Sequence, residues 1–249
     1  MIYLAFLEPY LGEEFISSLS SLNPIILSSL ILISSFILAT IVLFVIRFVG
    51  GKIAARTSVK FDDEIVKAIQ PPSFRLIILG GVYLSVLTLQ FDPTVSTIML
   101  NIIQSIAYIV VFLFIGRIFD IFLIHGLTDL SNKTGSKIDS EILPLFQKTM
   151  SVVIWIFGFI IILNVWGIDI GPLLAGVGIA GLAVSFALQS TLSNIFAGVS
   201  IILDKTFKVG DKIELESGEV GIINDITLRS TRITTYNNEV LVLPNDALA

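Results

Sequence analysis

Long apolar runs separated by short polar segments dominate the chain. Five of the runs are long enough to cross a bilayer, whose hydrocarbon core of about 30 Å needs roughly 20 helical residues. They cover approximately Ile25 to Val49, Phe74 to Phe91, Ile98 to Ile124, Thr149 to Trp166 and Gly171 to Leu203. The pattern therefore predicts five transmembrane helices. The last run is too long for one straight span, so we expect its helix to bend.

The fifth run differs from the other four because it is rich in very small residues. At helical spacing these residues form two narrow strips, and the bulkier side chains lie on a third face between them. The first strip holds Gly178, Gly181 and Ser185, the second holds Ala180, Ala183 and Ala187, and the third face holds Ala175, Ile179, Leu182, Phe186 and Gln189. Two flat strips allow two close neighbours, so copies of this helix can close a ring around the third face. A monomeric helix bundle is the alternative, because small-xxx-small contacts are common in membranes.

Polar residues interrupt the fifth run directly after a full membrane span. Gln189, Ser190, Thr191 and Ser193 lie close together there, with Asn194 next in the sequence. We therefore predict a bend, or hinge, at Gln189 and Ser190.

Beyond Asp204 the apolar residues alternate with polar ones, which is typical of β-strands. Turn residues occur at Ser217-Gly218 and at Asn237-Asn238. This spacing predicts a small antiparallel β barrel of about four or five strands. Arg229 and Arg232 are expected on a solvated or subunit-facing surface, with phosphate binding as a weaker option.

Composition agrees with a membrane protein and excludes several other classes. The chain is 55% hydrophobic, is only 14% charged and has a mean hydropathy of +0.95, which is unlike a soluble domain. A net charge of -5 gives no case for nucleic-acid binding. With one histidine and no cysteine, the chain offers no metal-binding or catalytic constellation. We expect no enzymatic activity, no metal and no cofactor.

The distribution of basic residues predicts the orientation in the membrane. Lys and Arg gather between Gly51 and Pro72 and between His125 and Lys148, whereas residues 1–24 and the turns after Phe91 and Trp166 contain neither. Because cytoplasmic loops carry an excess of basic residues, the N-terminus is expected outside a cell or inner membrane. Both basic loops and everything after Leu203 are expected in the cytoplasm.

The two basic loops resemble each other. Thr57 to Ile65 and Thr134 to Ile142 share Thr, Lys, Asp, Glu and Ile at one offset. We interpret this match as a duplicated hairpin in which a short amphipathic helix leads into the next span. Chance similarity between short polar loops is the alternative.

The segment from about Asp139 to Ala249 resembles the mechanosensitive channel of small conductance (MscS) family. The resemblance rests on the Gly/Ala-rich helix, LQSTLSNIFAG, FKVGDKI, the Thr-rich strand and the terminal Pro-Asn. It implies a homo-oligomer, heptameric if it follows the family, that opens under tension in the surrounding membrane lipids. Ions and small solutes would then pass during hypo-osmotic stress.

The resemblance also implies roles for particular residues. Leu182 and Phe186 match the pore-seal positions, with Phe in place of the commoner Leu, and Ser190 stands where the family commonly has Gly. The strands would form an Sm-like (SH3-like) β domain. Family members normally continue past Pro-Asn into an α/β domain that forms a perforated cage, whereas this sequence ends at Ala249. Either the sequence is part of a longer chain or filtering by a cage is absent.

The expected organisation has five parts, and two other functions stay open. An N-terminal segment occupies 1–24, an outer hairpin 25–91, a tension-sensing hairpin 92–166, the pore helix 167–203 and the β domain 204–249. The hairpin repeat would also fit a secondary transporter, but the spans lack the polar ligands that such a protein needs at mid-membrane. A non-conducting membrane scaffold is the third possibility.

Overall fold

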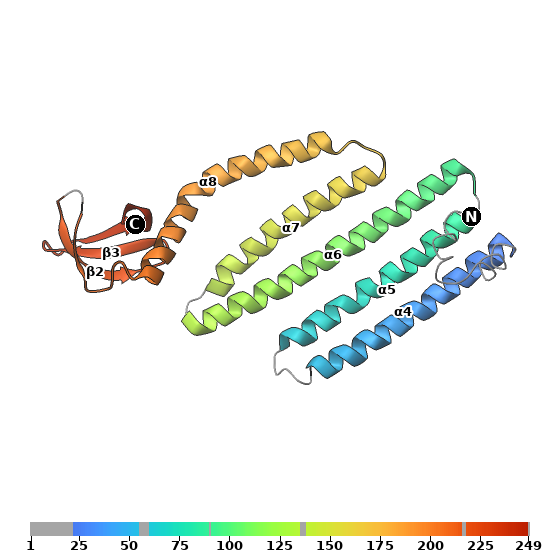
Figure 1. The fold of residues 1–249 in the computed structure, drawn as a ribbon, viewed down its shortest axis with the longest axis horizontal. Coiled ribbons are helices and arrows are strands. Elements are labelled where there is room, and N and C mark those ends of the chain that lie inside the picture. The colour runs from blue at the N-terminus through green and yellow to red at the C-terminus, as the bar shows by residue number, and fades with distance from the viewer. Residues whose placement is uncertain (1–21, 55–59, 90, 135–137, 216–217, 249) are drawn as a thin grey trace. The chain divides into compact units, whose positions relative to one another are not determined.

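The computed structural model describes residues 22–54, 60–89, 91–134, 138–215 and 218–248. The chain divides into two compact units between Ile170 and Gly171. Among the described residues, the first unit contains four long helices, and the second contains a fifth helix with a β-sheet (Figure 1). Most of the N-terminal segment 1–24 and much of the two similar loops, including Thr57 and Lys137, lie outside the described residues.

The helices of the first unit are longer than the apolar runs that predict them. They are α4 (Pro24–Ala54), α5 (Lys60–Thr88), α6 (Pro93–Thr134) and α7 (Ile138–Val165). The polar segments expected as short leading helices are instead the first turns of α5 and α7. Both helices continue through internal prolines. A proline removes one backbone hydrogen bond, and neighbouring turns and side chains can hold a membrane helix together around it.

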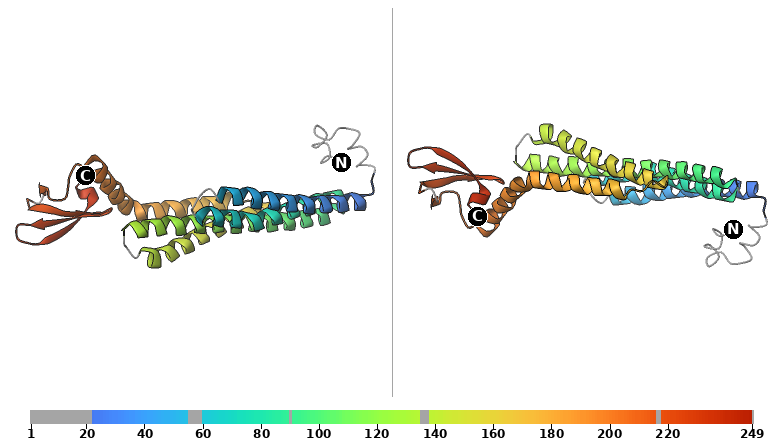
Figure 2. Two further views of the ribbon diagram at one scale, coloured as in Figure 1. Left: turned by 90° about the horizontal axis from the view of Figure 1, so that it is seen from below. Right: turned by 90° about the horizontal axis from the view of Figure 1, so that it is seen from above.

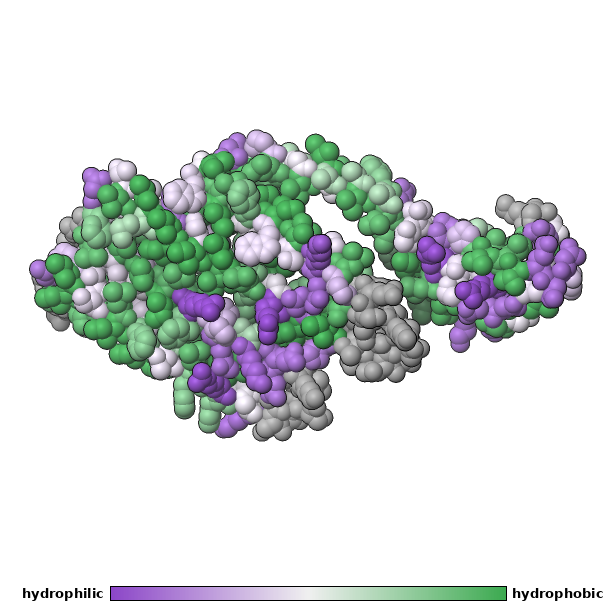
Figure 3. Space-filling view, turned by 180° about the vertical axis from the view of Figure 1, so that it is seen from behind, coloured by the Kyte–Doolittle hydropathy of each residue, from purple (hydrophilic) through white to green (hydrophobic). Residues whose placement is uncertain are grey.

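Successive helices of the first unit pack side by side, with α4 against α5, α5 against α6, and α6 against α7. Figure 1 shows this order, and the edge views in Figure 2 show that the four helices form a thin layer. A layer leaves each helix with two neighbours at most, so few side chains are buried. Figure 3 shows the largely hydrophobic surface that results. Lipid tails are as apolar as leucine, so such a surface is stable within a membrane.

Polar contacts add to the packing between these helices. The Ser85 hydroxyl on α5 donates to the Ser28 carbonyl on α4 at 3.0 Å. The Trp166 indole donates to the Ser105 hydroxyl on α6 at 3.1 Å. Such hydrogen bonds hold helices together where lipid provides no hydrophobic driving force between them.

In the second unit, α8 (Gly171–Asp204) precedes a four-stranded sheet. Its strands are β1 (Lys212–Glu214), β2 (Val220–Ile226), β3 (Ser230–Thr235) and β4 (Val240–Pro244), and a 3₁₀ turn, η1 (Asn245–Ala247), follows. The order β1-β2-β3-β4 is antiparallel throughout. Ile223 and Ile233 form the core of the sheet together with Ile201 from α8. The predicted antiparallel sheet is confirmed with four strands.

The hairpin turns follow from residues that tolerate a left-handed backbone. Thr235 and Glu239 close a three-residue loop in which Asn238 has a φ of 65°. Gly218, with a φ of 83°, occupies the equivalent position after Leu215. Three-residue hairpin loops commonly place Asn or Gly at such a position. The turn predicted at Asn237-Asn238 is confirmed, and so is the one at Gly218, whereas Ser217 lies outside the described residues.

The hydroxyl of Tyr236, in the same loop, interacts with Lys212 on β1. This hydrogen bond, followed by coulombic attraction to the same side chain, raises the pKa of Lys212 above its ordinary value. Lys212 is exposed and therefore stays protonated at neutral pH.

A prediction follows from the two adjacent glycines of α5. A Cβ added to Gly81 would overlap Ser35 of α4, whereas a Cβ added to Gly80 would have no atom within 4 Å. We expect Gly81→Ala to destabilise the protein by about 1–3 kcal/mol through overpacking. Gly80→Ala should be neutral or stabilising, because Ala has the higher helix propensity. Thermal unfolding in detergent measures both, and equal midpoints for the two variants would contradict this packing.

Candidate functional site

All residues predicted to line, seal or bend a pore lie on α8. The helix is unbroken from Gly171 to Asp204, and Figure 1 shows that it changes direction along its length. A straight helix of its 34 residues would be about 51 Å long, well beyond the hydrocarbon core of about 30 Å. A bend is therefore present, as predicted. Its placement at Gln189 and Ser190 stays a prediction.

The two small-residue strips face open space in this chain. A Cβ added to Gly178 or Gly181 would have no atom within 4 Å. The Ser185 hydroxyl donates to the Gly181 carbonyl of its own helix at 2.9 Å. The alanines of the second strip are exposed, and they are Ala180, Ala183 and Ala187. No contact of the described chain explains why these positions are small.

The third face also carries large exposed side chains. Ile179, Leu182 and Phe186 are 70%, 59% and 73% exposed. Ala175 and Gln189, at the ends of this face, are exposed as well. At roughly 100° per residue, this face lies between the two strips. The structure thus provides one continuous helix that carries all three predicted surfaces, and their roles in a pore stay predictions.

The second half of α8 contains a buried face that sequence reasoning missed. Its buried residues are Asn194, Gly198 and Ile201, spaced so that they lie on one side of the helix. This face contacts η1, at the end of the sheet. In the sequence, Asn194 is distinguished only as one of the polar residues that interrupt the fifth apolar run.

Asn245 is the centre of this contact. Its side chain is fully buried, and its amide oxygen accepts a hydrogen bond from the Thr231 hydroxyl at 2.9 Å. Its amide nitrogen donates to the Thr227 carbonyl at 3.0 Å and to the Asn194 carbonyl at 3.5 Å. One side chain therefore joins β3, the β2–β3 turn and α8. Every polar group of the amide is used, as the burial of a polar side chain requires.

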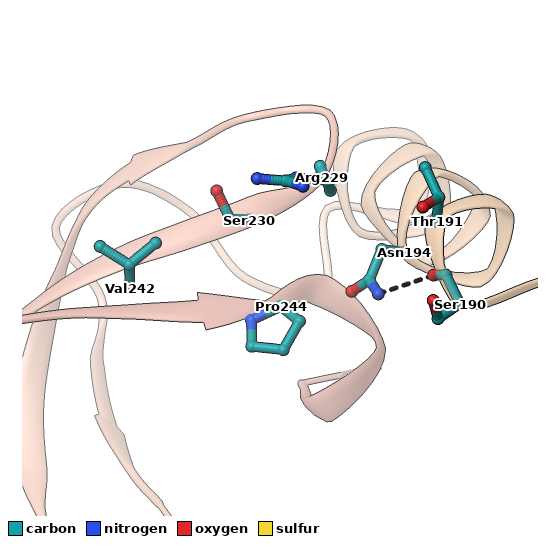
Figure 4. A pocket seen from close by; sticks show the side chains of 7 residues that line it. All are labelled: Ser190, Thr191, Asn194, Arg229, Ser230, Val242 and Pro244. Atoms are coloured by element: carbon teal, nitrogen blue, oxygen red, sulfur yellow. Dashed lines mark hydrogen bonds between the residues drawn. The ribbon is translucent and has the colours of Figure 1, made fainter. Parts of the chain in front are cut away.

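Asn194 forms a second, reciprocal link. Its amide oxygen accepts from the Asp246 backbone N–H, and its amide nitrogen donates to the Asp246 carboxylate, both at 3.1 Å. The same nitrogen donates to the Ser190 carbonyl at 2.8 Å (Figure 4). Gly198 permits this close approach, because a Cβ there would overlap the Asn245 amide and the Leu228 carbonyl. We call these contacts of Asn194, Gly198, Asn245 and Asp246 the helix–sheet junction.

A pocket of about 250 Å³ lies beside the helix–sheet junction (Figure 4). It is lined by three hydroxyl groups, one amide, one guanidinium and two apolar side chains. The residues are Ser190, Thr191, Asn194, Arg229, Ser230, Val242 and Pro244. Arg229 and Arg232 are both exposed, in agreement with a surface location.

Comparison with known proteins bears directly on the helix and the sheet. A family model described as "Mechanosensitive ion channel, transmembrane helices 2/3" matches residues 148–189. A second model, "Mechanosensitive ion channel, beta-domain", matches residues 190–249. The chain belongs to the MscS family. The resemblance seen in the sequence is therefore confirmed.

Relatives of this MscS-family chain extend the match to most of its length. The chain is 35% identical over 204 residues to the large-conductance mechanosensitive channel MscMJLR of Methanocaldococcus jannaschii, covering 82% of this chain and 56% of the relative. It is 29% identical over 229 residues to the small-conductance channel MscMJ of the same organism, covering 92% of this chain and 65% of the relative. The chain thus spans somewhat over half the length of these relatives.

A solved structure shows the same fold at low sequence identity. Arabidopsis thaliana MSL1 has a TM-score of 0.54 and 18% identity, over 74% of this chain and 61% of that one. An MscS-family chain is not an enzyme, which agrees with the expectation from the sequence.

The helix–sheet junction generates a prediction about stability. Asn245→Asp would replace two donated hydrogen bonds by a buried carboxylate facing two carbonyls. We expect a loss of roughly 3 kcal/mol in the free energy of unfolding. Asn237→Asp, the same change at an exposed turn residue, should stay within about 0.5 kcal/mol of wild type. Thermal unfolding with limited proteolysis of the sheet measures both, and a wild-type result for Asn245→Asp would refute the junction.

Proposed function

We propose that copies of this chain form a ring in a membrane and conduct ions when lateral tension opens the ring. The observation that carries this proposal is the open space at the small residues of α8, on both sides of the face with Leu182 and Phe186. Glycine in a helix is destabilising relative to alanine, so its presence calls for a close neighbour. Another copy of α8 is the neighbour that fits both strips.

Family membership supports a ring of this kind. MscMJLR and MscMJ are named as mechanosensitive channels of large and small conductance. A heptamer is the expected size if the chain follows its family. In such a ring, the strip with Gly178 and Gly181 of one copy would pack against the alanine strip of the next. The face with Ile179 and Phe186 would then point to the axis.

The third face provides a gate without a moving plug. Rings of Leu182 and Phe186 would narrow the axis with apolar side chains, and a narrow apolar constriction blocks ions by dewetting. Tension favours the state that occupies more membrane area, and it shifts the equilibrium only by the energy difference between the two states. Tilting of α8 would widen the rings and allow water and small solutes to enter.

The helix–sheet junction supports a hinge at Gln189 and Ser190. The second half of α8 is tied to the sheet by Asn194 and Gly198, and both residues lie beyond Ser190. A change of tilt in the first half would therefore be absorbed between the two halves. The boundary between the two family models also falls between Gln189 and Ser190. Closure of the four-stranded sheet into an Sm-like barrel is part of the same proposal.

The membrane arrangement completes the proposal. The N-terminus lies outside a cell membrane, the basic loops and sheet lie in the cytoplasm, and α4 to α7 transmit tension from lipid to the ring. Release of ions and small solutes under hypo-osmotic stress is the expected physiological role.

Substitution of the proposed seal gives a functional prediction. Phe186→Ser should lower the tension needed for opening, because a polar ring keeps water in the constriction. Val184→Ser is the matched control, since Val184 is also exposed at 57% but lies on the opposite side of α8. Patch recording from reconstituted liposomes gives both thresholds. Equal thresholds in the two variants would contradict the seal at Phe186. Absence of pressure-evoked current in the wild type would contradict the whole proposal and favour a non-conducting scaffold.

The mass of the assembly gives a separate prediction. We expect the detergent-solubilised complex to have a mass of about seven times 27.2 kDa, in addition to bound detergent. Native mass spectrometry measures the subunit number independently of conduction. A monomer or dimer cannot build the proposed ring.

A further inference from the structure

A groove of about 320 Å³ lies between α4 and α5 and combines positive charge with an apolar floor. Arg47 of α4 and Lys67 and Arg75 of α5 are its exposed basic residues. Leu43, Gln70 and Phe74 are half-buried beneath them. On α5 the lining residues recur at helical spacing, so they form one face toward α4. We call this site the basic groove.

No carboxylate in the part of the chain that the structure describes forms a salt bridge with Arg47, Lys67 or Arg75. The Glu64 carboxylate does approach the His125 imidazole, at 4.0 Å and outside the groove, and this contact is ionic only when the histidine is protonated. Within the groove, the Arg47 guanidinium donates to the neutral Gln70 amide oxygen at 3.1 Å. That bond orients the guanidinium and leaves its charge available. Three cations therefore line a small space that is suited to an anion.

The basic groove also lies at a defined membrane depth. No charged residue occurs from Pro24 to Ile46 before Arg47, or from Leu76 to Phe91 after Arg75. At 1.5 Å per residue, these stretches are about 34 Å and 24 Å long, which bracket a hydrocarbon core of about 30 Å. Arg47 and Arg75 thus end the apolar part of each helix on the same side. Phosphate groups of lipids lie at that level.

We propose that the basic groove binds an anionic phospholipid, with its phosphate among the three cations and an acyl chain along Leu43 and Phe74. A guanidinium matches phosphate geometry through paired N–H donors. Basic pockets between transmembrane helices bind acidic head groups in the same way. A zwitterionic lipid would bring its own cation against Arg47, Lys67 and Arg75, so phosphatidylglycerol is favoured over phosphatidylcholine. This inference needs only that α4 and α5 cross a membrane, and it is independent of conduction.

The test measures lipid binding to the whole purified chain. Native mass spectrometry in detergent, with added phosphatidylglycerol or phosphatidylcholine, should show selective retention of phosphatidylglycerol. The triple variant Arg47→Gln, Lys67→Gln, Arg75→Gln should bind it about 100-fold more weakly, at roughly fivefold for each cation. The control variant Lys52→Gln, Arg117→Gln, Lys148→Gln removes the same charge outside the groove and should bind like wild type.

A competition experiment and two controls distinguish a lipid site from a simple phosphate site and from misfolding. Glycerol 3-phosphate, which has no acyl chain, should not displace the lipid at equal concentration, and equal competition would identify a simple phosphate site and overturn the lipid proposal. Circular dichroism checks that both triple variants fold. If the groove variant does not, Arg75→Gln alone should lose about fivefold in affinity, and Arg75→Lys, which keeps the charge but not the paired donors, should lose less. Equal binding of the two lipids to wild type, or wild-type affinity in the groove variants, would refute the site.

Discussion

A fully buried asparagine holds the second unit of this protein together. An amide that is removed from water needs partners for its oxygen and both N–H groups, or it costs free energy. Asn245 finds them on three different segments, Thr231, Thr227 and Asn194. The geometry of the sheet therefore depends on where α8 lies, and the second half of α8 is held by the sheet. This mutual constraint makes a bent membrane helix and a small sheet one structural body.

The first half of α8 is subject to the opposite condition. A Cβ added to Gly178 or Gly181 would have no described atom within 4 Å, although glycine is a costly residue within a helix. In water such a helix would have to bury its apolar face, but lipid accepts apolar side chains without cost. In the first half of α8, residue size therefore tells more about the role of each position than polarity does. Small residues mark positions suited to close contact with another helix, and large residues mark positions that can line a pore.

Much of the architecture could be predicted from local sequence. Length and hydropathy identify five spans, and alternation identifies the strands. Asn238 marks its turn because a left-handed backbone suits asparagine. The ends of the helices were less predictable, because α5 and α7 begin in polar segments and pass through prolines. Hydropathy measures where lipid begins, whereas backbone hydrogen bonding decides where a helix begins.

By itself the sequence determined the membrane class, the five helices, the small-residue strips and the family, because each depends on the order and spacing of side chains along one segment. Tertiary structure alone decided that Asn194 and Gly198 meet Asn245, and that Arg47 shares a groove with Lys67 and Arg75. Those contacts join residues that are far apart in the chain. Their partners depend on how whole elements pack, which no local pattern encodes.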